Sequence, residues 1–159
     1  MKTKPILCAL TAALIASTAM ASGNHPGGHH AQSNTIGQPG KADKVSRTIA
    51  VDMTDAMRFS PADISVKRGE TIKFVVTNSG KVKHEMVLGS EKELKEHYEM
   101  MKKFPEMEHA DENMVTVQPG QTGEIIWEFS KAGKVNFACL QPGHYEAGMK
   151  GIVAVGAKK

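Results

Sequence analysis

The sequence predicts an all-β domain of the sandwich or small-barrel type, because short β-favouring runs recur between turn residues from about residue 45 onward. The turn signals include Asn78-Ser79-Gly80, Pro119-Gly120 and Ala132-Gly133. Strands are expected at residues 47–52, 63–67, 71–77, 82–88, 113–117, 123–129, 134–139 and 150–155. A chain of 159 residues is long enough for one domain and too short for two ordinary ones.

One segment departs from the β pattern and predicts a helix over about residues 90–104, inserted between two strands. Ser90 with Glu93 three residues later forms a capping box, and Pro105 supplies a stop. The apolar residues at helical spacing are Leu94, Tyr98, Met101 and Phe104. This stripe is expected to pack on the sandwich.

Residues 1–21 have the pattern of a cleavable signal peptide. Lys2 and Lys4 precede an apolar run over residues 6–16, and small residues ending in Ala19-Met20-Ala21 follow. A membrane anchor is the alternative, but the apolar run is far shorter than the roughly 20 residues of a spanning helix. We therefore expect export, cleavage after Ala21, a periplasmic location and no membrane insertion of the mature chain.

Cleavage would change both the charge and the cysteine content. Loss of Lys2 and Lys4 lowers the formal net charge from +3 to +1, which leaves no basic surface for nucleic acid. Cys8 would also be lost, so Cys139 would be the sole thiol and could form no intramolecular disulfide. A single thiol in an exported protein suggests an intermolecular bridge, a reactive thiol or a metal ligand.

The domain is expected at residues 45–159, preceded by a flexible arm over residues 22–44. The arm is rich in Gly, His, Ser, Asn, Gln and Pro and contains almost no apolar residues. Such a composition cannot bury enough surface to offset the entropy lost on ordering.

Near the C-terminus, Cys139-Leu-Gln-Pro-Gly-His144-Tyr-Glu-Ala-Gly-Met149 places a thiol, an imidazole and a thioether on one loop between two predicted strands. A second imidazole, His84, is available from a strand far upstream. Taken singly, a Cys or a Met is more often a packing residue, and a His is more often a surface residue or a satisfied core residue. Together, one Cys, two His and a weak axial Met form the ligand set of type 1 copper.

These residues lie in segments that closely resemble cupredoxins. The similar segments are Gly133-Lys-Val-Asn-Phe-Ala-Cys139 with the loop that follows it, and Val66-Lys-Arg-Gly-Glu-Thr-Ile-Lys-Phe-Val-Val-Thr-Asn78 followed by Lys83-His84-Glu85. The resemblance spans roughly residues 47–155 and implies a Greek-key β-sandwich holding one copper. It implies His84, Cys139 and His144 as trigonal ligands and Met149 as the axial ligand. The inserted helix and His-rich arm are more similar to periplasmic cupredoxins associated with copper tolerance than to plastocyanin.

Two departures from the family pattern leave the potential and colour of the site open. Many cupredoxins follow the first copper histidine with an Asn that ties this strand to the cysteine loop, whereas this sequence has Glu85. That link is therefore expected to be absent or differently made. The four-residue gap between Cys139 and His144 is also longer than that of plastocyanin.

A site filled by four protein ligands predicts an electron carrier rather than an enzyme. The sequence contains no His-x-His pair, as in multicopper oxidases, and no second Cys in the loop, as in binuclear oxidase centres. A redox partner protein is expected to dock transiently near His144 and Tyr145. Plain loop packing is an equal interpretation of Tyr145.

A second function, copper binding or buffering, is suggested by further His and Met residues. The arm contains His25, His29 and His30, which either collect metal or belong to a solvated linker. The predicted helix and the residues after it contain His97, Met100, Met107 and His109 as further candidate ligands for copper. Packing is the competing interpretation for neighbouring methionines such as Met101 and Met114.

Overall fold

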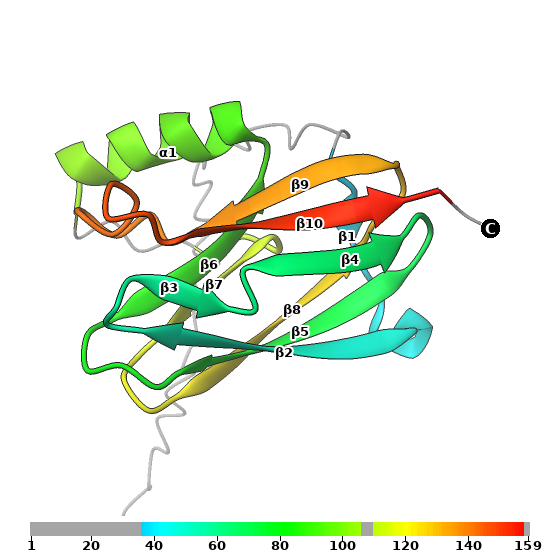
Figure 1. Ribbon diagram of the computed structural model, residues 1–159, viewed down its shortest axis with the longest axis horizontal. Helices are drawn as coiled ribbons and strands as arrows, with labels where there is room; N and C mark the ends of the chain where they lie inside the picture. Colours follow the sequence, from blue (N-terminus) through cyan, green and yellow to red (C-terminus); the bar gives the residue numbers. More distant parts are fainter. Residues whose placement is uncertain (1–35, 106–109, 158–159) are drawn as a thin grey trace, which may run out of the picture. The chain divides into compact units, whose positions relative to one another are not determined.

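Two five-stranded sheets form a sandwich in the computed structural model, which describes residues 36–105 and 110–157 (Figure 1). The first sheet has the order β1 (Gln38–Pro39), β8 (Thr122–Glu128), β5 (Thr71–Asn78), β2 (Arg47–Thr54), β3 (Arg58–Ser60). The second has the order β4 (Asp63–Lys67), β10 (Lys150–Gly156), β9 (Gly133–Ala138), β6 (His84–Gly89), β7 (Met114–Val117). Strands β2 and β5 pair in parallel, as do β4 and β10, and the other pairs are antiparallel. The predicted all-β sandwich is confirmed.

The core lies between the two sheets and is built from the inward side chains of alternating strand residues. Strand β5 illustrates the pattern, because Ile72, Phe74 and Val76 are fully buried while the residues between them are partly exposed. Aromatic rings meet edge to face across this core, with Phe59 and Phe137 5.0 Å apart between ring centroids. This geometry is favourable for aromatic pairs beyond the area that they bury.

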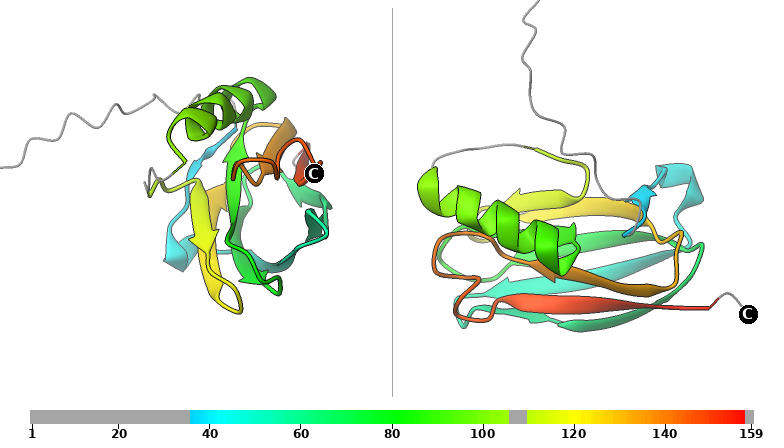
Figure 2. Two further views of the ribbon diagram at one scale, coloured as in Figure 1. Left: turned by 90° about the vertical axis from the view of Figure 1, so that its left-hand side faces the viewer. Right: turned by 90° about the horizontal axis from the view of Figure 1, so that it is seen from above.

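The predicted helix forms as α1 (Glu91–Lys103) and covers the outer face of the second sheet (Figure 2). Both hydrogen bonds of the capping box between Ser90 and Glu93 are present. Leu94, Tyr98 and Met101 pack against residues of β6, β9 and the loop after β9. Strand β6 therefore has the core on one face and α1 on the other, which explains why all six of its residues are buried.

The predicted place of Phe104 in the packed stripe is wrong. The helix ends at Lys103, and Phe104 is its C-cap residue, with φ −134° and a side chain that is 56% exposed. A residue that leaves the helical conformation no longer projects from the apolar face of the helix.

Residues ahead of position 45 also contact the sandwich. Gln38–Pro39 pairs with β8 as an edge strand, and a short 3-10 helix follows at Ala42–Lys44. Ile36 is buried, and its carbonyl accepts a hydrogen bond of 2.9 Å from the indole Nε1 of Trp127. The predicted signal peptide and residues 22–35 of the arm lie outside the described residues.

No α-helix in the described part of the chain combines the length and the apolar character that crossing a bilayer requires.

Candidate metal centre

Three of the four predicted ligands converge at one end of the sandwich. His84 is the first residue of β6, whereas Cys139 and His144 lie in the loop over residues 139–149, called here the ligand loop, which joins β9 to β10 (Figure 1, orange). Because β6 and β9 pair antiparallel, with Val87 opposite Ala138, the start of β6 lies beside the end of β9. The pairing of two strands therefore brings together residues that are 55 and 60 positions apart.

The three donor atoms form a triangle of the size that a metal ion needs. Nδ1 of His84 and Nδ1 of His144 are 3.2 Å apart, and Sγ of Cys139 lies 4.0 Å and 3.3 Å from them, respectively. A point equidistant from the three atoms lies about 2.1 Å from each, which matches the roughly 2.0–2.3 Å between a transition metal and its imidazole or thiolate ligands. Among the described residues, no other three His, Cys, Asp or Glu side chains gather in this way.

Met149, the fourth predicted ligand, is fully buried where the ligand loop enters β10. Its carbonyl accepts a hydrogen bond from the backbone N–H of Cys139 at 3.1 Å, and its own N–H donates to the carbonyl of His144 at 3.0 Å. These two bonds hold Met149 against both ligands of the loop. Its coordination of the metal stays a prediction.

Burial sets the protonation of the ligands in the metal-free protein. The side chain of Cys139 is fully buried, and this burial raises the pKa of its thiol to about 12. His144 is half-buried, and burial, followed by the proximity of His84, lowers the pKa of its imidazole. At neutral pH the site therefore presents a thiol that loses its proton on metal binding and, at His144, a neutral imidazole.

Glu85 links strand β6, which begins with His84, to the ligand loop. It makes this link through its carboxylate rather than through the side chain of an Asn. Its buried carboxylate accepts hydrogen bonds from the backbone N–H of Leu140 at 2.9 Å and from the side-chain amide of Gln141 at 3.0 Å. The backbone N–H of Glu85 also donates to Sγ of Cys139 at 3.4 Å. Such bonds around a metal ligand orient it and tune the metal.

Helix α1 also contacts the ligand loop. The hydroxyl of Tyr98 accepts a hydrogen bond from the backbone N–H of Gly143 at 3.3 Å and donates to the carboxylate of Glu146. The rings of Tyr98 and Tyr145 stack with their centroids 5.0 Å apart. Burial raises the pKa of Tyr98, and its bond to Glu146 adds to the effect. The helix thus holds the loop on both sides of His144.

Two further residues that hold the site were not identified from the sequence. Asp55, in the turn after β2, places its carboxylate Oδ1 3.2 Å from Nε2 of His84. Arg58, at the start of β3, donates from Nη1 to the carbonyl of Ala147 at 2.9 Å. Both contacts join segments far apart in the sequence, so no local motif indicates them.

Of the additional copper candidates, the structure describes only His97 and Met100. His97 and Met100 both lie on α1, where His97 is half-buried and Met100 is exposed. Met101 is buried against the sheet, as the packing interpretation predicts. The remaining candidates, His25, His29, His30, Met107 and His109, lie outside the described residues.

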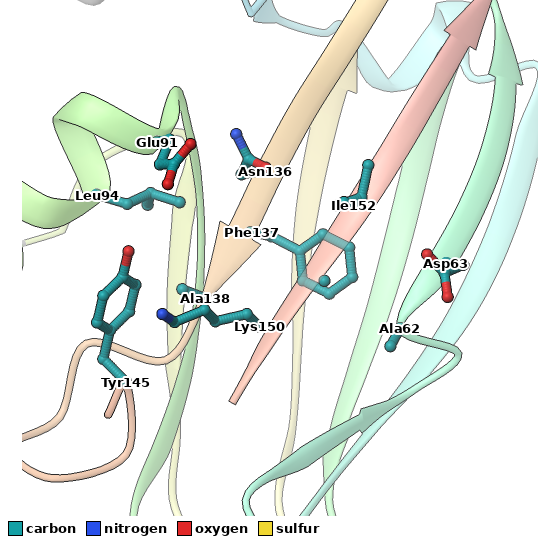
Figure 3. A pocket seen from close by; sticks show the side chains of 11 residues that line it. Ala62, Asp63, Glu91, Leu94, Asn136, Phe137, Ala138, Tyr145, Lys150 and Ile152 are labelled. Atoms are coloured by element: carbon teal, nitrogen blue, oxygen red, sulfur yellow. The ribbon is translucent and has the colours of Figure 1, made fainter. Parts of the chain in front are cut away.

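A pocket of about 380 Å³ lies beside the ligand loop but contains none of the four predicted ligands (Figure 3). Leu94 and Glu91 of α1 line one side, Phe137 and Lys150 come from β9 and β10, and Tyr145 comes from the loop. The Nζ of Lys150 lies 3.6 Å from the centroid of the Tyr145 ring. This pocket is therefore a separate feature on the outer face of the second sheet.

Comparisons with known proteins agree with the geometry. Residues 45–156 match the family model described as copper binding proteins of the plastocyanin/azurin family. The chain is 49% identical over 157 residues to the copper-resistant cuproprotein CopI of Rubrivivax gelatinosus, with 94% of each chain covered. It is 39% identical over 115 residues to CopI of Vibrio cholerae, covering 72% of this chain and 68% of that protein.

Solved structures show the same fold at low sequence identity. The reduced auracyanin of Roseiflexus castenholzii gives a TM-score of 0.59 at 23% identity, covering 70% of this chain and 98% of that one. Auracyanin A of Chloroflexus aurantiacus, a blue copper protein, gives a TM-score of 0.58 at 22% identity, covering 68% and 97%. The soft donor set, the size of the donor triangle and the family match agree on the metal, which is copper. The chain belongs to the plastocyanin/azurin family of copper-binding proteins, the cupredoxins.

Proposed function

We propose that this protein holds one copper in a type 1 centre and transfers single electrons, as an exported periplasmic protein that contributes to copper tolerance. The observation that carries the proposal is the buried triangle of one thiol and two imidazoles, with Met149 tied against it. Copper supplies a one-electron couple when bound. We assign His84, Cys139 and His144 as the equatorial ligands and Met149 as the weak axial ligand.

The surroundings of the ligands suit electron transfer because they are fixed before the metal binds. The ligand loop is restrained at several points, because Glu85 and Tyr98 accept hydrogen bonds from its backbone and Arg58 donates one to it. A restrained ligand set changes little between oxidation states, so an electron passes with little rearrangement. All four positions are filled by protein, which favours a carrier over an enzyme.

His144 offers the route by which electrons would leave the site. It is half-buried, whereas His84, Cys139 and Met149 are fully buried, so its ring edge lies nearest the solvent. Pro142 and Gly143 beside it are exposed. A redox partner protein would dock transiently on this small rim, as weak electron-transfer complexes do.

Visible spectroscopy with copper analysis tests this function directly. The mature protein is expected to bind one copper with strong thiolate-to-copper absorption, and Cys139→Ser is expected to abolish that absorption. Met149→Leu should keep the absorption and change the reduction potential, because the axial ligand tunes the potential. A Cys139→Ser protein with unchanged absorption would disprove the type 1 assignment.

Copper buffering is a second candidate, favoured by the relatives named copper-resistant cuproproteins, one of which matches 94% of this chain. That match covers most of the His-rich residues ahead of the domain, as well as the sandwich. Buffering predicts that each mature chain binds more than one copper ion, and that deletion of residues 22–35 lowers the number of copper ions bound per chain. A ratio of one copper that is unchanged by the deletion would eliminate this candidate.

A further inference from the structure

The outer edge of the buried ligand His84 faces the carboxylate of Asp55. Oδ1 of Asp55 lies 3.2 Å from Nε2 of His84, on the opposite side of the ring from the Nδ1 that faces Cys139 and His144. His84 is fully buried, whereas the side chain of Asp55 is 39% exposed. The inner end of the carboxylate therefore contacts the ligand while the rest of it reaches the surface.

Asp55 is fixed in this position by the loop that leads into β6. The backbone N–H of Lys81 donates to its Oδ2 at 2.8 Å, and that of Val82 donates to its Oδ1 at 3.4 Å. The N–H of Lys81 is also the largest of the effects that lower the pKa of Asp55, so the group is a carboxylate at neutral pH. Two backbone donors and the imidazole thus restrain both carboxylate oxygens.

The loop itself is shaped so that Asp55 can approach closely. Buried Asn78 donates to the carbonyl of Val82 at 2.8 Å and accepts from the N–H of Gly80 at 2.9 Å, which folds the loop back on itself. A side chain at Gly80 would place its Cβ 2.2 Å from Oδ1 of Asp55. A glycine here leaves the space that the carboxylate occupies.

The Asp55–His84 contact has a direct chemical consequence. A hydrogen bond to Oδ1 requires the proton of the neutral imidazole to be on Nε2, which leaves the lone pair of Nδ1 pointing toward the donor triangle. A carboxylate partner also makes the imidazole a stronger donor and places a negative charge near the metal. Both effects favour Cu(II) more than Cu(I).

We infer that Asp55 is a positioning residue of the metal centre: it sets the tautomer and orientation of His84 before copper binds, and it lowers the reduction potential of the bound copper. The second part rests on the proposed function. The first part concerns the metal-free protein and is independent of it.

The first experiment records imidazole ¹⁵N NMR spectra of the metal-free protein and of Asp55→Ala and Asp55→Asn. Native His84 is expected to be almost entirely the Nε2–H tautomer, and Asp55→Ala is expected to show a mixture. The Asp55→Asn side chain keeps one oxygen, which can accept a hydrogen bond from either His84 or Lys81. The change in tautomer in this variant should therefore be smaller than in Asp55→Ala. Gly80→Ala keeps the carboxylate but displaces it, and should shift the tautomer in the same direction as Asp55→Ala.

The second experiment measures Cu(II) and Cu(I) affinities and the reduction potential of the same variants. Loss of such a partner typically costs 10–100-fold in metal affinity, and we expect this loss in Cu(II) affinity with a smaller loss for Cu(I). Each tenfold fall in Cu(II) affinity relative to Cu(I) affinity raises the reduction potential by about 59 mV.

The matched control is Asp52→Asn. Asp52 also lies on the β2 side and binds the same loop, through a 2.7 Å hydrogen bond from Ser79 Oγ, but no contact joins it to His84 among the described interactions. It removes the same charge without touching the ligand. If the Asp55 variants keep the native tautomer and shift the potential no more than Asp52→Asn does, the inference is wrong. If native protein lacks type 1 absorption, the proposed function fails while the NMR result still decides the role of Asp55 in the metal-free protein.

Discussion

The hydroxyl of Tyr98, on α1, accepts a hydrogen bond of 3.3 Å from the backbone N–H of Gly143, the residue before the ligand His144. The same hydroxyl donates to Glu146, two residues after that ligand. The Tyr98 side chain therefore connects the inserted helix by hydrogen bonds to the residues on both sides of His144. Removal of the hydroxyl tests whether this connection matters for the metal.

Tyr98→Phe keeps the buried ring and its stacking on Tyr145 but leaves the Gly143 N–H and the Glu146 carboxylate without this partner. We expect a loss of about 1–2 kcal/mol in the free energy of unfolding and faster copper release to a chelator. Denaturant unfolding and stopped-flow copper transfer would measure the two effects. Tyr145→Phe, which removes a hydroxyl from the other ring of the stack, is the control. If Tyr98→Phe and Tyr145→Phe show the same stability and the same rate of copper release, the hydrogen bonds of the Tyr98 hydroxyl do not stabilise the metal centre.

Glu85 allows a test of the tie between β6 and the ligand loop. Glu85→Ala leaves the N–H of Leu140 and the amide of Gln141 without an acceptor in a buried place, which we expect to cost roughly 2–5 kcal/mol of stability. Glu85→Gln should cost less, because one oxygen still accepts from Leu140 and the Gln141 amide can turn to offer its own oxygen. Urea unfolding of the metal-free proteins measures both. An alanine variant as stable as the native protein would show that the tie contributes little.

Copper binding should release a proton from Cys139. The thiol has a pKa of about 12 in the metal-free protein, so it is protonated throughout the neutral range and must lose its proton to bind copper. Between neutral pH and pH 12, apparent copper affinity should therefore rise about tenfold per pH unit. Because the pKa of His144 is lowered, that residue adds to the slope only in the acidic range. Calorimetry in buffers of different ionisation enthalpy counts the protons, and binding without proton release near pH 7.5 would contradict the pKa of the thiol.

The strand pattern and the convergence of His84, Cys139 and His144 could be predicted, because the strands follow local patterns and the donor types are chemically distinctive. Strands β2 and β4–β10 coincide with apolar runs bounded by turn residues, and the spacing from Cys139 to Met149 is a motif in itself. His84 could be proposed only from its place in a predicted strand far upstream, since a single histidine in a strand has no distinctive pattern. Only the pairing of β6 with β9 shows why it lies at the site.

The residues that hold the ligands could not be predicted. Asp55, Arg58 and Tyr98 act through contacts with residues 29, 89 and 45 positions away, and each is an ordinary surface or core residue by sequence. Strand β1 was missed because two residues give no periodicity, and its stability comes from its pairing with β8.

The N-terminal boundary can be tested with the single tryptophan of the chain. A protein beginning at residue 36 should keep Trp127 buried and bonded to Ile36, with blue-shifted fluorescence. A protein beginning at residue 45 loses β1, the Ile36 side chain and this hydrogen bond, which we expect to cost roughly 2–5 kcal/mol. Its emission should move to longer wavelength. Identical spectra and unfolding midpoints would show that residues 36–44 are dispensable.

The distance along the chain between His84 and the ligand loop determines the order of folding and copper binding. Since these residues meet only when β6 pairs with β9, an unfolded or half-synthesised chain lacks the complete donor triangle. Capture of copper by the complete donor triangle must therefore follow folding. Bound copper would in turn stabilise the whole sandwich by mass action, because the complete site exists only in the folded chain and binds copper more tightly than the unfolded chain does. The metal content of the compartment would then govern how long each molecule survives proteolysis.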